Sequence, residues 1–479
     1  MAQTAQITQF PTEPQNEAQR ILQLQRKAYL AKPYPTYEER LDNLRKLEQI
    51  LVENEQAIAE AIRSDFGNRA IEESKLLEIF LSIDGIRYAR KRMKKWMKPQ
   101  KRGVSVWFAG AGNRVLAQPK GVVGIVVPWN YPLFLAIGPL TSALAAGNRC
   151  MIKMAANSRH LCELLHGLFM EQFDESVLAI LPGVRGSDFT TQPFDHVIFT
   201  GSADTGRTVM RAAAENLTPV TLELGGKSPT IVAEDFDIET AASRILFTKF
   251  MNAGQTCVAP DYLYLPESKR DEFVEAAKRI VAKRYPNLSN GQFTTVIDDP
   301  SYSRLVDTLA DAKSNGATVV NLTPRYEPDP ESRLMPPQLV LDAGDDTRIM
   351  REEIFGPLLP IRTYRDIDDV LAYINERDRP LGLYLFSDDK ALQEKVIRNT
   401  ISGGVSINDC SFQVAQHDMP FGGIGASGMG HYHGHEGFVE FSKMRPIFSQ
   451  FRFSALPLLY PPYGKVFNLL YRVMIKLKL

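Results

Sequence analysis

Along residues 16–96, apolar positions recur at the spacing of helices. Leu41, Leu44, Leu47 and Leu51 share one face of a predicted helix, with mostly charged and polar side chains between them. Another helix is predicted over about 72–96, where lysines and arginines toward the carboxyl end favour the helix dipole. The chain therefore begins with helices, and from 104 to 119 its pattern becomes irregular and β-like.

From residue 121, short apolar runs alternate with helical segments. The runs over 122–127, 150–154, 177–181 and 196–200 predict buried strands, with helices after the first, second and fourth. Strands separated in this way form a parallel sheet with helices on both faces. A second α/β run extends from about 228 to 407. The predicted fold class is therefore α/β, with a doubly wound, Rossmann-like sheet of the nucleotide-binding type.

Residues 121–147 carry no charged side chain and are long enough to span a bilayer. Pro128, Pro132 and Pro139 interrupt this stretch, and prolines disrupt the hydrogen bonding that a spanning helix needs. We therefore expect a buried strand, a turn and a buried helix. The start of the chain lacks the basic and apolar regions of a signal peptide, and about the first 15 residues suggest a mobile polar tail.

Composition narrows the class of protein. The 479 residues suggest two or three domains, and 44% hydrophobic with 23% charged residues is typical of a globular protein. Lys+Arg and Asp+Glu are both 56, so the positive excess that favours nucleic-acid binding is missing, and no nucleic-acid partner is expected. The 4 cysteines form no C-x-x-C pair, which argues against a zinc or redox motif and favours a reducing, cytoplasmic compartment.

A glycine-containing loop from Gly201 through Ser202 to Gly206 follows a predicted strand and opens a helix. Glycines at such a turn let a phosphate approach the backbone N–H groups at the positive helix end. The spacing differs from G-x-G-x-x-G, and an ordinary strand–helix turn explains the loop equally well.

Cys257 and Glu223 are candidates for chemistry. Cys257 follows Gly-Gln-Thr after a predicted helix, which suits a positioned nucleophile, although a lone cysteine is more often a packing residue. Glu223 lies between two leucines, where burial would raise the pKa of its carboxyl and suit a general base. The alternative for Glu223 is an ordinary glutamate at the edge of a strand.

Six motifs occur in order between residues 128 and 423: PWN at 128–130, the Gly201 loop, LELGGKSP at 222–229, GQTC at 254–257, EEIFGP at 352–357 and PFGG at 420–423. Together they resemble the aldehyde dehydrogenase superfamily, whose members oxidise aldehydes to acids with NAD or NADP. The resemblance covers about residues 20–450. YHGHEGF at 432–438 and YPPYGK at 460–465 are similar to the class 3 and fatty-aldehyde branch, and IRSDFGNRA with VVGIVVPWNYP to coniferyl-aldehyde dehydrogenases.

The resemblance assigns catalytic roles. Cys257 is implied as the nucleophile that forms a thiohemiacetal and then a thioester. The Asn130 side-chain amide and the Cys257 backbone N–H are implied as donors to the oxyanion, and Glu223 as the base that activates the hydrolytic water. The implied substrate is an aromatic or phenylpropenyl aldehyde such as coniferyl aldehyde, with a long-chain aliphatic aldehyde as the alternative. A non-catalytic binding protein on the same fold is the remote alternative.

The same resemblance implies a set of cofactor-binding residues: Trp129, Lys153, Gly201, Ser202, Gly206, Glu353 and Phe355. Within it, Lys153 bonds the adenosine ribose, Ser202 faces the pyrophosphate, and Glu353 holds the nicotinamide ribose. The sequence departs from the family at Ala156, where a glutamate usually grips the ribose 2′-hydroxyl. NAD is the implied cofactor, and without that carboxylate NADP is also admitted.

The expected organisation divides the chain into four parts. Residues 1–98 and 121–224 form the NAD(P)-binding domain, with a five-stranded sheet, and residues 225–408 form the α/β catalytic domain. Residues 99–120 and 409–450 form a small β bridging element, which in the family mediates homodimers. Residues 451–479 form a C-terminal tail, apolar with interspersed Lys and Arg, which either docks on this chain or a partner subunit or lies weakly on a membrane surface.

Three alternating histidines at 431, 433 and 435 raise the question of a metal site. On a strand their side chains would share one face, but apart from Glu436 no carboxylate or cysteine stands at ligand spacing. No metal is therefore expected, and Cys150, Cys162 and Cys410 are expected to be packing residues.

Overall fold

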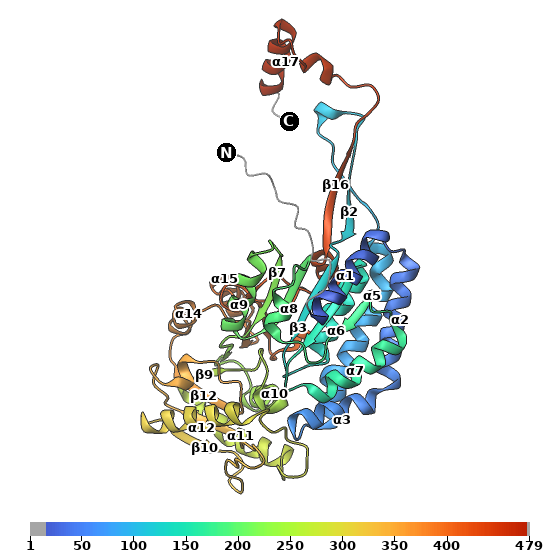
Figure 1. Ribbon diagram of the computed structural model, residues 1–479. Coiled ribbons are helices and arrows are strands. Elements are labelled where there is room, and N and C mark those ends of the chain that lie inside the picture. Colours follow the sequence, from blue (N-terminus) through green and yellow to red (C-terminus); the bar gives the residue numbers. More distant parts are fainter. Residues whose placement is uncertain (1–15, 477–479) are drawn as a thin grey trace.

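The computed structural model describes residues 16–476, so the tail expected over the first 15 residues lies outside the described part of the chain. Three sheets organise these residues (Figure 1). Two of them are large and mainly parallel, and the third is a long three-stranded ribbon that projects from the rest (Figure 1). This is the α/β class that the alternation of strands and helices predicts.

The first large sheet has the order β15-β7-β6-β3-β4-β5. Its five parallel strands are β3 (Val122–Val127), β4 (Arg149–Met154), β5 (Leu178–Ile180), β6 (His196–Gly201) and β7 (Val220–Leu224). The two-residue strand β15 (Gly428–Met429) adds to β7 in the antiparallel sense. Its connecting and covering helices are α1 (Glu17–Ala31), α2 (Tyr37–Glu53), α3 (Glu55–Phe66), α5 (Leu81–Trp96), α6 (Phe134–Ala146), α7 (Arg159–Gln172), α8 (Gly186–Thr190) and α9 (Ala203–Ala214).

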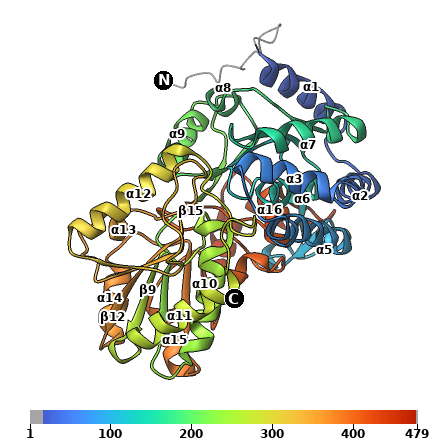
Figure 2. The same cartoon turned by 90° about the horizontal axis from the view of Figure 1, so that it is seen from below.

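The second large sheet has the order β10-β11-β12-β9-β8-β13-β14 and lies beside the first (Figure 2). Its strands are β8 (Pro229–Val232), β9 (Tyr262–Pro266), β10 (Thr318–Asn321), β11 (Gln338–Leu341), β12 (Leu358–Tyr364), β13 (Gly382–Phe386) and β14 (Gly404–Ile407). All its pairings are parallel except that of β10 with β11. Its helices are α10 (Ile238–Phe250), α11 (Arg270–Arg284), α12 (Asp299–Ser314), α13 (Arg348–Arg351), α14 (Ile367–Asn375) and α15 (Lys390–Asn399), with 3-10 turns η3 (Met251–Gly254) and η4 (Glu267–Lys269).

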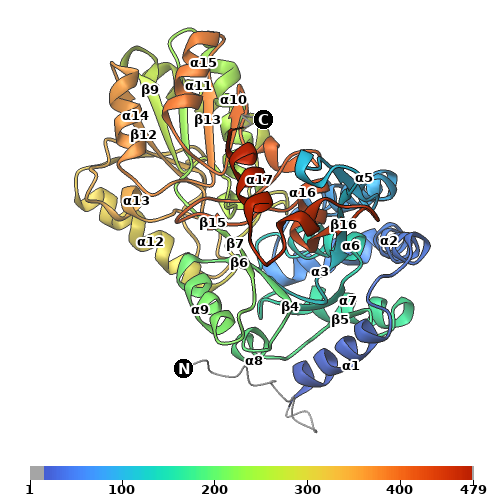
Figure 3. The same cartoon turned by 90° about the horizontal axis from the view of Figure 1, so that it is seen from above.

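The ribbon consists of β1 (Gln100–Arg102), β2 (Gly112–Pro119) and β16 (Ser442–Ser449), in antiparallel order β1-β2-β16, with the 3-10 turn η2 (Val106–Phe108) near its tip. Residues 409–441 connect β14 to β16. They contain η5 (Phe412–Ala415), β15 and α16 (Gly434–Glu440), which packs on α5 and α6. Beyond β16 follow η6 (Leu456–Leu459) and the helix α17 (Lys465–Lys476), which Figures 1 and 3 place above the body of the chain.

The charge-free segment folds as the buried strand β3 and the buried helix α6, as its prolines predict. Leu133, Ile137 and Leu140 are fully buried, and the helix stops at Gly147, whose φ of +91° is open to glycine without strain. Within residues 16–476, no helix is long and apolar enough to cross a bilayer.

The helix predicted over 72–96 is not regular. It begins as α4 (Ile71–Ser74), passes through a π-helical turn η1 (Lys75–Phe80), and continues as α5. Single π-helical turns inside α-helices are frequently found at functional sites.

Candidate active site

A cavity of about 330 Å³ lies where the two large sheets meet, and most of the residues singled out by the motifs line it. Trp129 and Asn130 come from the loop after β3, Gly201 and Ser202 from the end of β6, and Glu223 from β7. Cys257, Glu353 and Phe355 come from loops of the second sheet. Ligands of open α/β sheets bind at the carboxyl ends of the strands, and this cavity lies at that position.

Cys257 follows a strained turn. Asn252 and Ala253 both have φ of +50°, and Gly254 has +74°. A methyl group on Gly254 would stand 2.3 Å from the Gly356 carbonyl, so the close approach of these two loops needs a glycine here. The turn fixes Cys257 at the cavity wall. Burial, with the neighbouring carboxylates of Glu353 and Glu223, raises the pKa of the Cys257 thiol to about 12, so nucleophilic attack requires a nearby proton acceptor.

Asn130 is almost completely buried, and its backbone is held from two sides. The Asn130 carbonyl accepts hydrogen bonds of 3.0 Å from Arg69 Nη1 and of 3.0 Å from the Asn252 side-chain amide. Because Asn252 belongs to the turn before Cys257, one carbonyl ties the loop of the expected oxyanion donor to the loop of the expected nucleophile. The sequence analysis gave neither residue a role at the site, although Arg69 lies in the IRSDFGNRA segment and Asn252 stands five residues before Cys257, because their contacts with Asn130 form only through tertiary packing.

Glu223 is 2% exposed, and among the described residues neither of its carboxyl oxygens has a hydrogen-bond partner. Burial raises the pKa of this carboxyl well above its usual range, and the negative charge of Glu440 adds to the effect. A carboxyl in this state takes up a proton readily, which is the property that a general base next to a thiol requires.

The other end of the cavity fits a dinucleotide. Ser202 lines the cavity and caps the twelve-residue helix α9, where its hydroxyl accepts a hydrogen bond from the Thr205 N–H at 3.4 Å, so the positive end of α9 lies at the cavity. Glu353 lies directly against Gly225, where a methyl group would stand 2.2 Å from its carboxylate, and accepts a hydrogen bond from the Gly226 N–H at 3.2 Å. Burial raises the pKa of Glu353 to about 8. Phe355 meets Trp129 edge to face, with 5.4 Å between the ring centroids.

Two residues of the expected cofactor set do not line this cavity. Lys153 lies at the end of β4, where its Nζ donates to the Met154 carbonyl at 2.6 Å. Gly206 lies in the first turns of α9 and packs against Leu224, which leaves no room for a side chain. Residues that the motifs did not reveal, Ser301 and Arg304 of α12, also line the cavity.

A second cavity of about 260 Å³ opens beside the first and is lined almost entirely by apolar side chains. Of the described residues, Cys257 alone lines both cavities. The wall of the second one is built by segments far apart in sequence: Leu76, Leu77, Phe80, Leu81, Tyr131, Phe134, Leu135, Phe247, Met251, Thr256, Val258, Ser411, Phe412, Val414, Ala415 and Phe421. Its hydroxyl groups already have partners: Tyr131 bonds Thr256 at 2.8 Å, and Ser411 donates to the Val258 carbonyl. We call this cavity the apolar channel.

The π-helical turn η1 supplies Leu76, Leu77 and Phe80 to the apolar channel, and Leu76 and Phe80 are more than half exposed. Because these two side chains both line the channel and reach solvent, we infer that its entrance lies here. The sequence could not reveal this, because a π-turn leaves no pattern distinct from a regular helix.

The three alternating histidines do not share one face of a strand. His433 precedes α16 with φ of +96° and is buried, its ring stacked on Phe421 at 5.4 Å, and His435 belongs to α16 itself. Burial lowers the pKa of His433 to about 3, so its ring is neutral. Within residues 16–476, no group of three His, Cys, Asp or Glu side chains could hold a metal ion.

The fold, with a cavity at the carboxyl ends of its strands and a cysteine shared with a second cavity, is that of a dinucleotide-dependent oxidoreductase. Residues 2–447 match the model of the aldehyde dehydrogenase family. The chain is 50% identical to a probable coniferyl aldehyde dehydrogenase of Pseudomonas aeruginosa, over 96% of this chain and 97% of that one. It is 42% identical to the coniferyl aldehyde dehydrogenase of Pseudomonas sp., over 94% of each chain.

Solved structures show the same likeness. The substrate-bound AldH of Staphylococcus aureus superposes with a TM-score of 0.90 at 34% identity, over 96% of this chain and 100% of that chain. An aldehyde dehydrogenase of Mycobacterium tuberculosis complexed with NAD+ gives 0.81 at 29% identity, over 91% and 90% of the two chains. This chain belongs to the aldehyde dehydrogenase family, and it is an NAD(P)-dependent aldehyde dehydrogenase, as the six motifs predict.

Proposed function

We propose that this enzyme oxidises a phenylpropenyl aldehyde, such as coniferyl aldehyde, to the carboxylic acid through a thioester on Cys257. The observation that carries the proposal is the position of Cys257 as the residue common to the cofactor cavity and the apolar channel. The apolar lining of the channel suits the hydrocarbon body of such a substrate, and the names of the two Pseudomonas relatives support this class of aldehyde.

The first step joins substrate and enzyme. Cys257 Sγ attacks the carbonyl carbon, its proton passes to Glu223, and the carbonyl oxygen becomes an oxyanion. The Asn130 amide and the Cys257 N–H stabilise that charge, at a site where burial strengthens each hydrogen bond. NAD or NADP, when bound, accepts the hydride that leaves the substrate carbon. The residues that would hold it are Glu353 at the ribose, Phe355 and Trp129 beside the ring, and Gly201 and Ser202 at the pyrophosphate.

The second step releases the acid. Glu223, once its carboxylate is regenerated, removes a proton from water, and the resulting hydroxide adds to the thioester carbon. The carbon–sulfur bond then breaks, and the acid leaves while Cys257 keeps the electron pair. Both steps use the same carboxyl, which explains why it lies buried beside the thiol without a fixed partner.

The test compares substrates and cofactors on the purified enzyme at 340 nm. Coniferyl, cinnamyl and benzyl aldehydes and a long-chain aliphatic aldehyde are measured with NAD and with NADP, with and without coenzyme A. Highest kcat/KM with the phenylpropenyl aldehydes, unchanged by coenzyme A, supports the proposal. A higher kcat/KM with the aliphatic aldehyde contradicts the substrate class. Cys257→Ala should lower kcat more than about a hundredfold while cofactor affinity stays near that of the wild type.

The organisation proposed for the chain keeps the expected boundaries: 1–98 with 121–224 for the cofactor, 225–408 for catalysis, 99–120 with 409–450 as the bridging element, and 451–479 as the tail. We also propose a homodimer formed through the ribbon, because β16 leaves one edge without a partner strand among the described residues. Sedimentation equilibrium tests this, and a monomer at micromolar concentration contradicts it.

A further inference from the structure

The loop that carries Glu353 has almost no regular structure of its own. After the single turn of α13, residues 352–357 form neither helix nor strand, and Phe355 has φ of +48°. Loops of this kind are usually the mobile parts of a protein. Yet Glu353 must stand at one place, against Gly225, to meet a ribose. Something outside the loop therefore holds it.

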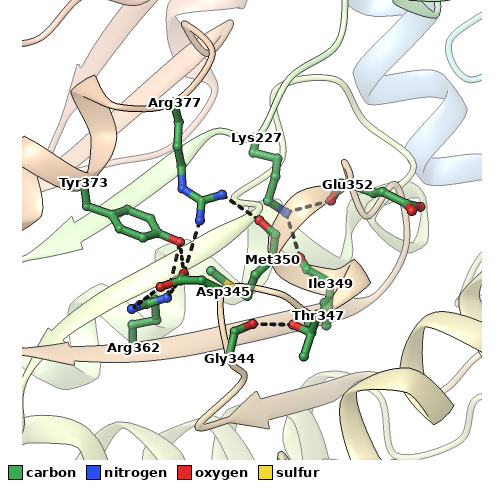
Figure 4. Close-up of polar contacts among 10 residues, drawn as sticks. All are labelled: Lys227, Gly344, Asp345, Thr347, Ile349, Met350, Glu352, Arg362, Tyr373 and Arg377. Carbon is green, nitrogen blue, oxygen red and sulfur yellow. Dashed lines mark hydrogen bonds and ion pairs between the residues drawn. The ribbon is translucent and has the colours of Figure 1, made fainter. Parts of the chain in front are cut away.

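Lys227 holds this loop by its backbone (Figure 4). Its Nζ donates to the Ile349 carbonyl at 2.8 Å and to the Glu352 carbonyl at 2.8 Å. The first oxygen lies within α13, and the second belongs to the residue directly before Glu353. An ammonium group has three donors, and two of them are used here on main-chain oxygens.

Asp261 completes the contact. Its Oδ2 pairs with the same Lys227 Nζ, and its Oδ1 accepts a hydrogen bond from the Ile354 N–H at 3.0 Å. The two side chains are 12% and 5% exposed, so the pair is little screened by water. Lys227 and Asp261 thus bond the backbone on both sides of Glu353.

A second group of side chains holds the start of the same segment (Figure 4). Arg377 donates to the Met350 carbonyl at 2.8 Å and, with Arg362 and Tyr373, surrounds the Asp345 carboxylate. From the cavity side, Arg304 donates to the Ile354 carbonyl at 2.8 Å. The segment is therefore anchored at its start and on both sides of Glu353, while the Glu353 side chain is left for the cavity.

Lys227 also lies next to the backbone that Glu353 touches. Gly226, whose N–H bonds the Glu353 carboxylate, directly precedes Lys227. Residues 223–227 thus carry the expected base Glu223, the N–H group that bonds the Glu353 carboxylate, and the lysine that holds the Glu353 loop. We propose that Lys227 and Asp261 are positioning residues that set the place of the Glu353 carboxylate and thereby the affinity for the cofactor. This inference rests on the proposed role of Glu353 at the nicotinamide ribose.

The decisive experiment separates cofactor binding from cysteine chemistry. NAD affinity of the aldehyde-free enzyme is measured by calorimetry, and Cys257 is assayed with p-nitrophenyl acetate, an activated ester that acylates a thiol without any cofactor. Lys227→Met should raise the Kd for NAD at least tenfold, while ester hydrolysis stays within about twofold of wild type. Lys227→Arg should recover part of the affinity, because a guanidinium also reaches two carbonyls. Lys278→Met, at an exposed lysine of α11, is the matched control.

The outcomes are distinct. Wild-type NAD affinity in Lys227→Met overturns the inference, and so does a parallel loss of ester hydrolysis and cofactor affinity, since that marks general damage. If Lys227→Met does not fold, Asp261→Asn decides: it should weaken NAD binding severalfold with ester hydrolysis retained, and unchanged binding overturns the inference. Glu353→Gln separates the proposed role of Glu353 in cofactor binding from the positioning role of Lys227. If it leaves NAD affinity unchanged, the proposed role of Glu353 is wrong, whereas an effect in Glu353→Gln without one in Lys227→Met refutes only the positioning role.

Discussion

At the scale of single residues, the site combines two acids whose protons are unusually hard to remove. Burial raises the pKa of both the Cys257 thiol and the Glu223 carboxyl. A raised carboxyl pKa makes Glu223 a stronger base than an ordinary glutamate, which suits it to accept the proton of a reluctant thiol. The raised pKa of Glu223 therefore offsets the raised pKa of Cys257 when the proton passes from the thiol to the carboxylate.

The pH dependence of kcat follows from this shift. The base must be ionised to activate water, so hydrolysis slows as pH falls through the raised pKa of Glu223, above the range of an ordinary glutamate. In Glu223→Gln this acidic limb should disappear. The first turnover should slow because the thiol loses its proton acceptor, but hydrolysis should slow more because water is a weaker acid than a thiol, so a burst of NADH should precede the steady state. Stopped-flow measurement checks both. An equal fall of the first turnover and the steady state would show that Glu223 does not act mainly in hydrolysis.

Ala156 is the residue on which the choice of cofactor depends. It is exposed and lies just beyond β4, where the sequence lacks the usual glutamate. NADP should therefore support a kcat/KM within about a hundredfold of that with NAD, a difference of ~2.7 kcal/mol. Ala156→Glu should penalise NADP selectively through repulsion of the 2′-phosphate. Steady-state kinetics with both cofactors is the measurement, and equal losses with NAD and NADP would place position 156 away from the ribose.

At the scale of elements, a buried ion pair joins the π-turn to the start of α6. Glu78 of η1 pairs with Arg69 at 2.7 Å, and both side chains are fully buried. The same carboxylate accepts hydrogen bonds from the Leu133 and Phe134 N–H groups at 2.7 and 3.2 Å, and Arg69 reaches the Asn130 carbonyl. One pair thus fixes the channel entrance and the Asn130 loop together.

Removing one member of this ion pair should lower the stability of the fold more than removing both. Glu78→Gln removes the direct ion-pair partner of the buried Arg69 and leaves only the longer-range charge of Glu73 to balance it. Breaking a buried pair in this way typically costs about 3–5 kcal/mol. The double variant Arg69→Met, Glu78→Leu removes both charges of the pair and should melt at a higher temperature than Glu78→Gln. Differential scanning fluorimetry compares the two proteins. A double variant that is less stable than the single one would contradict this account, and kcat should fall in both because the Asn130 loop is loosened.

At the scale of the whole molecule, the C-terminal tail lies apart from the body. Within the described residues, α17 packs against η6 and buries none of its own side chains, and Leu469, Val473 and Ile475 are exposed. From 451 to 476 the charged residues are all basic: Arg452, Lys465, Arg472 and Lys476. An apolar helix face with basic flanks is typical of a segment that lies on an anionic membrane surface. We therefore propose weak membrane contact through this tail.

Sedimentation with lipid vesicles tests the tail. The full chain should bind vesicles that contain phosphatidylglycerol, and binding should weaken as salt increases, because lysine and arginine contribute through screened charges. A chain ending at residue 450 should remain unbound while retaining dehydrogenase activity. If the full chain ignores the vesicles yet forms a larger oligomer than the shortened chain, the tail covers a partner subunit instead.

Much of this molecule could be predicted from sequence, and the limits have physical reasons. The strands of the first sheet are buried on both faces and read as continuous apolar runs, and Cys257, Glu223 and Asn130 belong to ordered motifs, so their elements were predicted. The walls of the apolar channel were not, because residues 76, 134, 247 and 412 meet only through tertiary packing. The role of Lys227 was also hidden, since its partners are backbone oxygens more than a hundred residues away.

The meeting of two cavities at Cys257 has a consequence for traffic through the enzyme. In the proposed reaction the dinucleotide binds in the first cavity and the aldehyde in the apolar channel, so neither blocks the entry of the other. The acid can leave through the apolar channel while the reduced dinucleotide is still bound. The order in which the two products dissociate then depends on how tightly each is bound. An apolar inhibitor bound at the channel entrance around Leu76 and Phe80 would therefore prevent aldehyde binding and leave the exchange of the dinucleotide unchanged.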